Sequence, residues 1–224
     1  DTAETDYRVT TRTPFGRDPL AELADACRDR GVGLGFYHSL LDWHHPAYTA
    51  DWPAYRDYLF AQVRELCSGY GAVYSIWFDG HWPASDHAAD KGWVRPDADY
   101  RFDELYGLIH ELQPDCMVGN NHHVDPLPGE DFQIFEQDLP GENTAGHSAS
   151  AVSALPLETC LTMNRSWGWR TDDDDYKSVD DLAATLDRLS AMPANLLLNV
   201  GPRPDGTIPE RSADLLRELG RRRD

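Results

Sequence analysis

The chain has 224 residues, of which 41% are hydrophobic, so it can bury a full core and lacks the composition of a disordered segment. Its formal net charge is −19, and no basic patch offsets it, so neither nucleic acid nor an anionic membrane is an expected partner. The sequence contains no apolar run of about 18 residues, the length of a membrane-spanning helix, and no visible signal peptide.

Hydrophobic periodicity predicts helices and strands that alternate along the chain. The predicted elements, in chain order, are a helix at 18–30, a strand at 32–37, a helix at 53–68, a strand at 73–79, a helix at 102–112, strands at 116–119, 131–136 and 158–163, a helix at 178–191, a strand at 195–200 and a helix at 209–221. Ser178 and Asp181 are spaced as in a capping box, and Pro209 suits the first turn of the last helix. Alternation of this kind predicts an α/β fold with a parallel sheet wrapped by helices.

Polar and aromatic side chains cluster where the predicted strands end, which is the active face of parallel α/β folds. Neither a GxGxxG turn nor a GxxxxGK[ST] loop is present, so nucleotide-binding folds lose support. The four cysteines form no CxxC pair, which excludes a zinc knuckle, and Cys27 and Cys67 are expected to be buried free thiols.

Asp79 ends the apolar run that begins at Val73 and is followed directly by Gly80. A buried parallel strand delivers a carboxylate to the mouth of a sheet in this way. A turn or helix-cap role is the alternative for this aspartate. Glu136 also follows an apolar approach, and Phe132 and Phe135 beside it are expected to desolvate it and raise its pKa. An exposed loop acid is the alternative for Glu136.

Two carboxylates that face each other across a cleft are the machinery of glycoside hydrolysis. The pair His44 and His45 suits hydrogen bonding to sugar hydroxyls, with metal ligation or a surface loop as alternatives. Trp167 and Trp169 suit stacking on the apolar face of a sugar, although packing beneath a loop explains them nearly as well. The acidic run 172–175 is expected to be a solvated turn, with calcium binding as the alternative.

At these motifs the sequence resembles the α-L-fucosidases, family 29 of the glycoside hydrolases. The matching segments are Gly35–Ser39 with Asp42–Pro46; Ile76–Gly80; Asp131–Phe132 with Glu136; Glu158–Asn164 with Ser166–Gly168; and Asn195–Pro202 with Asp205–Gly206. The resemblance implies a (β/α)8 barrel, a retaining two-step mechanism and no cofactor. It makes Asp79 the nucleophile and Glu136 the acid/base, and it places Tyr37 in the fucose pocket. The expected sugar-contacting residues are Tyr37, His38, Trp43, His44, His45, Trp77, His122 and Trp167.

The chain also departs from the family pattern. The family's first two barrel strands, with a sugar-binding His-His pair, and its C-terminal β-sandwich are missing, so residues 1–224 are expected to form a partial, incomplete TIM-like catalytic barrel. His122 stands where many members carry arginine. The leading hypothesis is a fucosidase that acts on fucosylated oligosaccharides or glycoconjugates. A catalytically inactive carbohydrate-binding remnant and a glycosidase for another sugar are the alternatives. The sequence is compatible with a homo-oligomer, and the family would allow a secreted or periplasmic protein.

Overall fold

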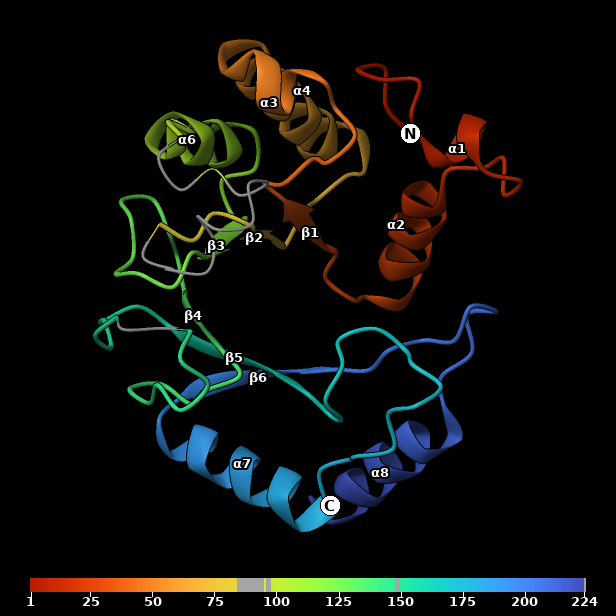
Figure 1. Ribbon diagram of the computed structural model, residues 1–224, viewed down its shortest axis with the longest axis vertical. Helices are drawn as coiled ribbons and strands as arrows, with labels where there is room; N and C mark the ends of the chain where they lie inside the picture. Colours follow the sequence, from red (N-terminus) through yellow and green to blue (C-terminus); the bar gives the residue numbers. More distant parts are fainter. Residues whose placement is uncertain (84–94, 96–97, 148–149, 224) are drawn as a thin grey trace. The chain divides into compact units, whose positions relative to one another are not determined.

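The computed structural model describes residues 1–83, 95, 98–147 and 150–223, in two compact units. The first unit spans residues 1–132 and the second spans residues 133–224 (Figure 1). In the first unit the elements are α1 (Val9–Arg12), α2 (Pro19–Arg30), β1 (Gly35–Ser39), α3 (Ala47–Ala50), α4 (Trp52–Gly69), β2 (Ser75–Asp79), α6 (Phe102–Leu112) and β3 (Met117–Asn121). In the second unit they are β4 (Gln133–Glu136), β5 (Leu157–Thr162), α7 (Val179–Ala191), β6 (Ala194–Asn199) and α8 (Glu210–Arg221).

The sheet of the first unit has the strand order β1-β2-β3, and both pairs are parallel. The register aligns Ser39 with Asp79 and Asp79 with Asn121, so these three residues form the last row at the carboxyl edge. One row before the middle of the sheet, Phe36, Ile76 and Val118 are aligned in the same way and are buried. They belong to the core that the sheet shares with α2, α4 and α6, which lie beside it in Figure 1.

The other face of this sheet is not covered by the helices of the first unit. Tyr37, Trp77 and Gly119 are aligned across the three strands, one residue beyond the buried row. Because successive side chains of a strand point to opposite faces, this row lies away from the helices. Tyr37 is 62% exposed, which fits that placement. The helix-free face therefore carries the residues from which a site can be built.

The helices begin and end at the residues that the sequence marks. Asp18 caps α2 by accepting hydrogen bonds from the amides of Leu20 (3.0 Å) and Ala21 (3.2 Å), and Gly31 ends this helix in the left-handed conformation (φ 66°). Ser178 and Asp181 form the predicted capping box at the start of α7. These stops fix where the chain turns from each helix into the next strand.

The second unit has the strand order β4-β5-β6, again with parallel pairs. Figure 1 shows α7 and α8 on one side of this sheet. Their small core is built around Met163, Leu182 and Leu219, with Leu198 of β6 packed against it. The opposite side of the sheet is not covered by these two helices.

The predicted strands and long helices are confirmed, and the strands pair in parallel as expected. The described residues form two three-stranded sheets and no closed barrel. Asp131 donates its amide to the carbonyl of Val118 (2.8 Å) and accepts from the Val118 amide at Oδ2 (2.8 Å). Asp131 is thus bound to β3 through both its backbone and its side chain.

All four cysteines are free, as expected, and Cys67 is buried whereas Cys27 is only half-buried. Leu23 of α2 is 49% exposed. None of the described helices is long and apolar enough to cross a membrane.

Candidate active site

Asp79 is the last residue of β2 and is held by side chains from both neighbouring strands. The Tyr37 hydroxyl, from β1, donates to Oδ2 (2.7 Å), and Nδ2 of Asn121, from β3, donates to Oδ1 (3.2 Å). Each carboxylate oxygen thus accepts a hydrogen bond from a different strand. This arrangement fixes the plane of the carboxylate at the edge where parallel sheets carry their chemistry. The alternative of a simple turn or cap aspartate does not account for it.

An aromatic surface leads up to this carboxylate on the same face of the sheet. The rings of Tyr37 and Trp77 stack with centroids 5.6 Å apart and an interplanar angle of 22°. Beside Trp77 the strand has Gly119, and a Cβ there would lie only 2.3 Å from the Phe132 ring. Phe132 therefore covers the position that a side chain of residue 119 would take. An aromatic surface with a carboxylate at its edge is suited to a sugar, which has an apolar face and polar hydroxyls.

His38 does not join this surface, contrary to expectation. It follows Tyr37 in β1 and so points to the opposite face, where its ring lies 5.8 Å from that of the buried Phe78. Burial lowers the pKa of His38 below its ordinary value of 6.5. We therefore assign His38 to the packing between sheet and helices.

The loop after β1 carries the next three candidates. Asp42 accepts hydrogen bonds at Oδ1 from the amides of His44 (2.9 Å) and His45 (2.8 Å), which bends the chain at the start of α3. The two imidazoles then diverge. His44 stacks on Tyr7 at 3.7 Å, and His45 stacks on Tyr58 of α4 at 4.2 Å.

The divergence of these two rings gives no support to metal ligation by the pair. Among the described residues, no three His, Cys, Asp or Glu side chains gather as a metal site would require. Trp43, in the same loop, is 76% exposed and so presents its indole to solvent. An exposed indole beside the carboxyl end of β1 is available to a ligand.

His122 follows β3 directly but is enclosed by the protein. Its side chain is 2% exposed, Nε2 lies 2.8 Å from Oε1 of Glu130, and Nδ1 accepts from the amide of Val124 (3.2 Å). Both ring nitrogens are thus engaged inside the first unit. The expectation that His122 contacts the sugar is therefore replaced by a structural role, because a group this buried does not reach a ligand.

Glu136 lies in the second unit, at the carboxyl end of β4, and is half-buried. The next residue, Gln137, has a positive φ of 58° and ends the strand, with its amide donating to the carbonyl of Cys160 (2.9 Å). Its Nε2 also donates to Oγ1 of Thr162 (3.3 Å). The carboxylate of Glu136 is thus carried on a backbone that β5 holds. Its distance from Asp79 and the predicted rise of its pKa stay predictions.

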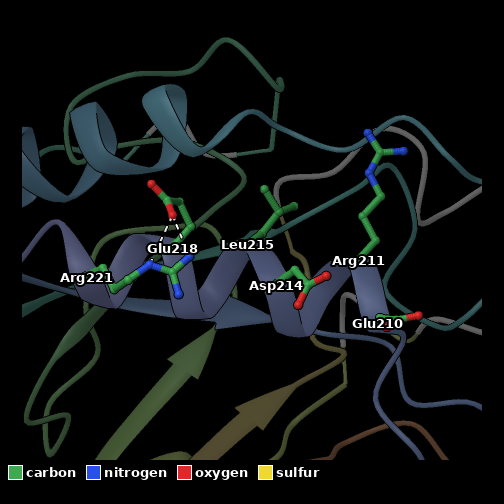
Figure 2. Close-up of a pocket in the computed structure, with 6 residues that line it drawn as sticks. All are labelled: Glu210, Arg211, Asp214, Leu215, Glu218 and Arg221. Carbon is green, nitrogen blue, oxygen red and sulfur yellow. Dashed lines mark hydrogen bonds and ion pairs between the residues drawn. The ribbon is translucent and has the colours of Figure 1, made fainter.

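Trp167, also in the second unit, is 43% exposed, and its carbonyl accepts from Nδ2 of Asn199 (2.8 Å) at the carboxyl end of β6. Elsewhere in this unit a pocket lies along α8, and Figure 2 shows the side chains that line it. Its lining residues are Glu210, Arg211, Asp214, Leu215, Glu218 and Arg221. All six come from one helix, Arg221 is paired with Glu218 (2.6 Å), and none is a candidate residue. This pocket has no part in the candidate site.

Sequence reasoning missed two residues that bind candidate residues of the first unit. Asn121 binds Asp79, and Glu130 binds His122. Asn121 was visible in the sequence as a polar residue at the end of a strand, but only the pairing of β2 with β3 sets it beside Asp79. Glu130 carries no such signal, because it lies in a connection without helix or strand.

Comparison with known proteins gives a consistent result. A family model described as Alpha-L-fucosidase matches residues 1–222. Alpha-L-fucosidase 1 of Arabidopsis thaliana is 28% identical over 96% of this chain and 44% of its own length, and the human tissue alpha-L-fucosidase is 28% identical over 86% and 40%. The chain therefore spans less than half the length of these relatives.

Solved structures agree with the sequence matches. Alpha-L-fucosidase isoenzyme 1 from Paenibacillus thiaminolyticus is similar with a TM-score of 0.75 and 35% identity, over 98% of this chain and 55% of that chain. The alpha-L-fucosidase AlfC from Lactobacillus casei, in complex with its alpha-L-fucose product, gives a TM-score of 0.76 and 26% identity over 97% and 68%.

Proposed function

Because the chain belongs to the α-L-fucosidase family, we propose that it carries the catalytic machinery of a retaining exo-glycosidase that removes terminal α-L-fucosyl residues from glycans or glycoconjugates. The observation that carries this proposal is the setting of Asp79. Its carboxylate ends a central strand, is held by Tyr37 and Asn121, and lies beside the stacked rings of Tyr37 and Trp77. That is the setting in which a carboxylate can attack one defined atom of a bound sugar.

We assign the nucleophile to Asp79 and the acid/base to Glu136. In the first step Asp79 forms a bond to the anomeric carbon while the acid protonates the departing glycosidic oxygen. In the second step the same acid, now a base, takes a proton from water, which displaces Asp79 and releases fucose. A retaining mechanism of this kind requires the two carboxyl groups to lie about 5 Å apart. No cofactor takes part in either step.

The substrate class follows from relatives and from the aromatic surface. AlfC has been solved with the alpha-L-fucose product and, as a variant, with Fuca(1,6)GlcNAc. For this chain we propose a fucosylated oligosaccharide or glycoconjugate, contacted by Tyr37 and Trp77 at the fucosyl ring. The exposed side chains of Trp43, His44 and Trp167 are candidates for contact with the rest of the glycan. We give no sugar contact to His38 or His122, and His45 packs on Tyr58.

For the fold we propose that the two parallel sheets belong to one (β/α)8 catalytic domain of the TIM type. Two features support this proposal. Helices connect β1 to β2, β2 to β3 and β5 to β6 as in such a barrel, and structures of family members match nearly the whole chain. In such a barrel the carboxyl ends of all strands face the substrate, which is where Asp79 and Glu136 lie in their own strands.

The test is hydrolysis of 4-nitrophenyl α-L-fucopyranoside by the full chain. We expect turnover by the wild type and a loss of about 1,000-fold or more for Asp79→Ala, with partial rescue by azide, which would replace the missing nucleophile. Asp131→Asn, which changes a carboxylate distant from this edge of the sheet, is the matched control and should stay active. Fucose binding without turnover by the wild type would instead show an inactive carbohydrate-binding remnant. Turnover of galactosides alone would show a different glycosidase.

The role of Glu136 has a separate test. Glu136→Gln removes the proton donor, so substrates with poor leaving groups should slow far more than activated aryl fucosides, whose leaving groups need little protonation. Equal losses on both kinds of substrate would show that another group is the acid.

A further inference from the structure

Four side chains near the carboxyl end of β3 form a connected hydrogen-bond chain inside the first unit. Nδ2 of Asn120 donates to the Tyr106 hydroxyl (2.9 Å), and that hydroxyl donates to Oε1 of Glu130 (3.1 Å). His122 contacts the same oxygen through Nε2 (2.8 Å). We call Asn120, Tyr106, Glu130 and His122 the β3 anchor; all four residues are buried.

The donors and acceptors of the β3 anchor are mutually consistent. Nδ1 of His122 accepts from the amide of Val124, so Nε2 carries the ring proton and donates to Glu130. The Tyr106 hydroxyl uses its lone pair for Asn120 and its proton for Glu130. Two donors therefore converge on one oxygen of a buried carboxylate. Hydrogen bonds to an ionised acceptor are about twice as strong as neutral ones, and burial strengthens them further.

The β3 anchor holds the residues on both sides of Asn121 through hydrogen bonds. Asn120 is tied to Glu130 through Tyr106, and His122 is tied to it directly. Successive side chains of an extended strand point to opposite sides. With residues 120 and 122 held on the helix-covered side, the side chain of Asn121 is turned to the other side, where it meets Oδ1 of Asp79.

The chain beyond this point cannot continue the strand. His123 adopts a left-handed conformation (φ 64°), so the backbone turns away immediately after His122. A strand that ends so abruptly would leave Asn121 free to twist unless its neighbours were fixed. Glu130 supplies that fixation from a connection that carries no helix or strand of its own.

We propose that Glu130, with His122 and Tyr106, is a positioning residue that holds Asn121 on Asp79 and thereby sets the orientation of the nucleophile. This proposal rests on the proposed function only for its kinetic consequence. The hydrogen-bond geometry from which it is drawn stands without it. It also gives His122 a purpose that differs from sugar contact.

The chain offers a matched control one residue further on. Asp131 pairs with His110 (Nε2 to Oδ2, 2.9 Å), and its side chain also accepts from the Val118 amide near the start of β3. It is a second histidine–carboxylate pair formed by the same connection. Its histidine lies on α6, and its carboxylate also binds β3. Its place is at the opposite end of β3 from Asn121, so its loss should affect stability without affecting Asp79.

The first measurement needs no catalysis. The side-chain amide signal of Asn121 is followed by NMR during a pH titration in the full chain. In the wild type and Asp131→Asn, the signal should shift as the Asp79 carboxylate at the other end of the hydrogen bond titrates. In Glu130→Gln, which replaces the charged acceptor at nearly constant size, and in Tyr106→Phe, the shift should fall to about half or less. A wild-type shift in both variants would overturn the proposal.

The second measurement is kinetic. Glu130→Gln should lower kcat on 4-nitrophenyl α-L-fucopyranoside about 10-fold or more, with KM within about twofold, because misplacement of a reacting group acts on the chemical step. Tyr106→Phe should act in the same direction, and Asp131→Asn should stay within about twofold when each protein is fully folded. If the wild type has no activity, the proposed function fails and the NMR titration alone decides on the β3 anchor. If the wild type is active and the variants match Asp131→Asn in both measurements, the anchor has no positioning role.

Discussion

Gly119 is the position where a small change should have a large and specific effect. A Cβ built on this residue would lie 2.3 Å from Cζ, 2.4 Å from Cε2 and 2.8 Å from Cε1 of Phe132. Ordinary contacts between carbon atoms begin at about 3.4 Å, so the ring must retreat by about 1 Å for Gly119→Ala to be accommodated. Phe132 is only 8% exposed, so its surroundings resist that movement.

The loss of stability caused by Gly119→Ala can be estimated for two possible responses of the Phe132 ring. If the ring stays and the surroundings strain, overpacking of a buried site costs about 1–3 kcal/mol. If the ring swings into solvent, the loss of its burial costs about 1.5–3 kcal/mol. Either route predicts that Gly119→Ala lowers the free energy of unfolding by about 1–3 kcal/mol. At a strand position free of this contact, the same change would be neutral or stabilising, by up to about 1 kcal/mol.

A double-mutant cycle with Phe132→Leu separates the contact from other effects. Leucine lacks Cζ and both Cε atoms, which are the three atoms in conflict with the new Cβ. The four proteins would be compared by urea denaturation. We expect Gly119→Ala to cost about 1–3 kcal/mol in the wild-type background and close to nothing in the Phe132→Leu background. An interaction energy below about 0.5 kcal/mol would refute the reasoning, because the contact would then not be what excludes a side chain at residue 119.

Two further predictions concern buried titratable groups. Burial lowers the pKa of His38 in the folded protein, so its contribution to the free energy of unfolding is complete above the unfolded pKa of about 6.5 and is lost as the pH falls from there towards the folded pKa. Urea denaturation between pH 7.5 and 5 should therefore show a smaller loss of unfolding free energy for His38→Gln than for the wild type, with the exposed His147→Gln as the control. The same pH dependence in His38→Gln and the wild type would refute this prediction. Burial also raises the pKa of Cys67 to about 11 and of Cys116 to about 12. Iodoacetamide at pH 8 should therefore label both thiols slowly until urea unfolds the chain, as read by mass spectrometry, and rapid labelling in the folded protein would contradict their burial.

The sequence predicted the elements well because each depends on local information. Helical periodicity predicted α6 over its whole length, and the spacing of Ser178 and Asp181 predicted the start of α7. The strand that ends at Asp79 was visible because a long apolar run stops at a charged residue. Such signals need no knowledge of which strand pairs with which.

Other features depend on contacts between residues far apart in the chain, and no local sequence pattern indicates them. Asp131 binds Val118 of β3 through both its backbone and its side chain. The enclosure of His122 depends on Glu130, in a segment without periodicity. For both residues the decisive partner is chosen by the folded arrangement, so the sequence could show that they were polar but not which group they would meet.

The register of the β1-β2-β3 sheet explains why a few residues determine the geometry around Asp79. Ser39, Asp79 and Asn121 share a row only because each strand pairs without a slip. A slip of one residue in β3 would turn Asn121 to the helix-covered side and bring Asn120, now on the open face, beside Asp79. Asn120 would then lose its bond to Tyr106, and Val118 would leave the core. The β3 anchor opposes that slip, since Asn120 and His122 are both tied to Glu130. The buried network on the packing side and the carboxylate on the open side are thus two consequences of the same strand alternation, and a change in the first must reach the second.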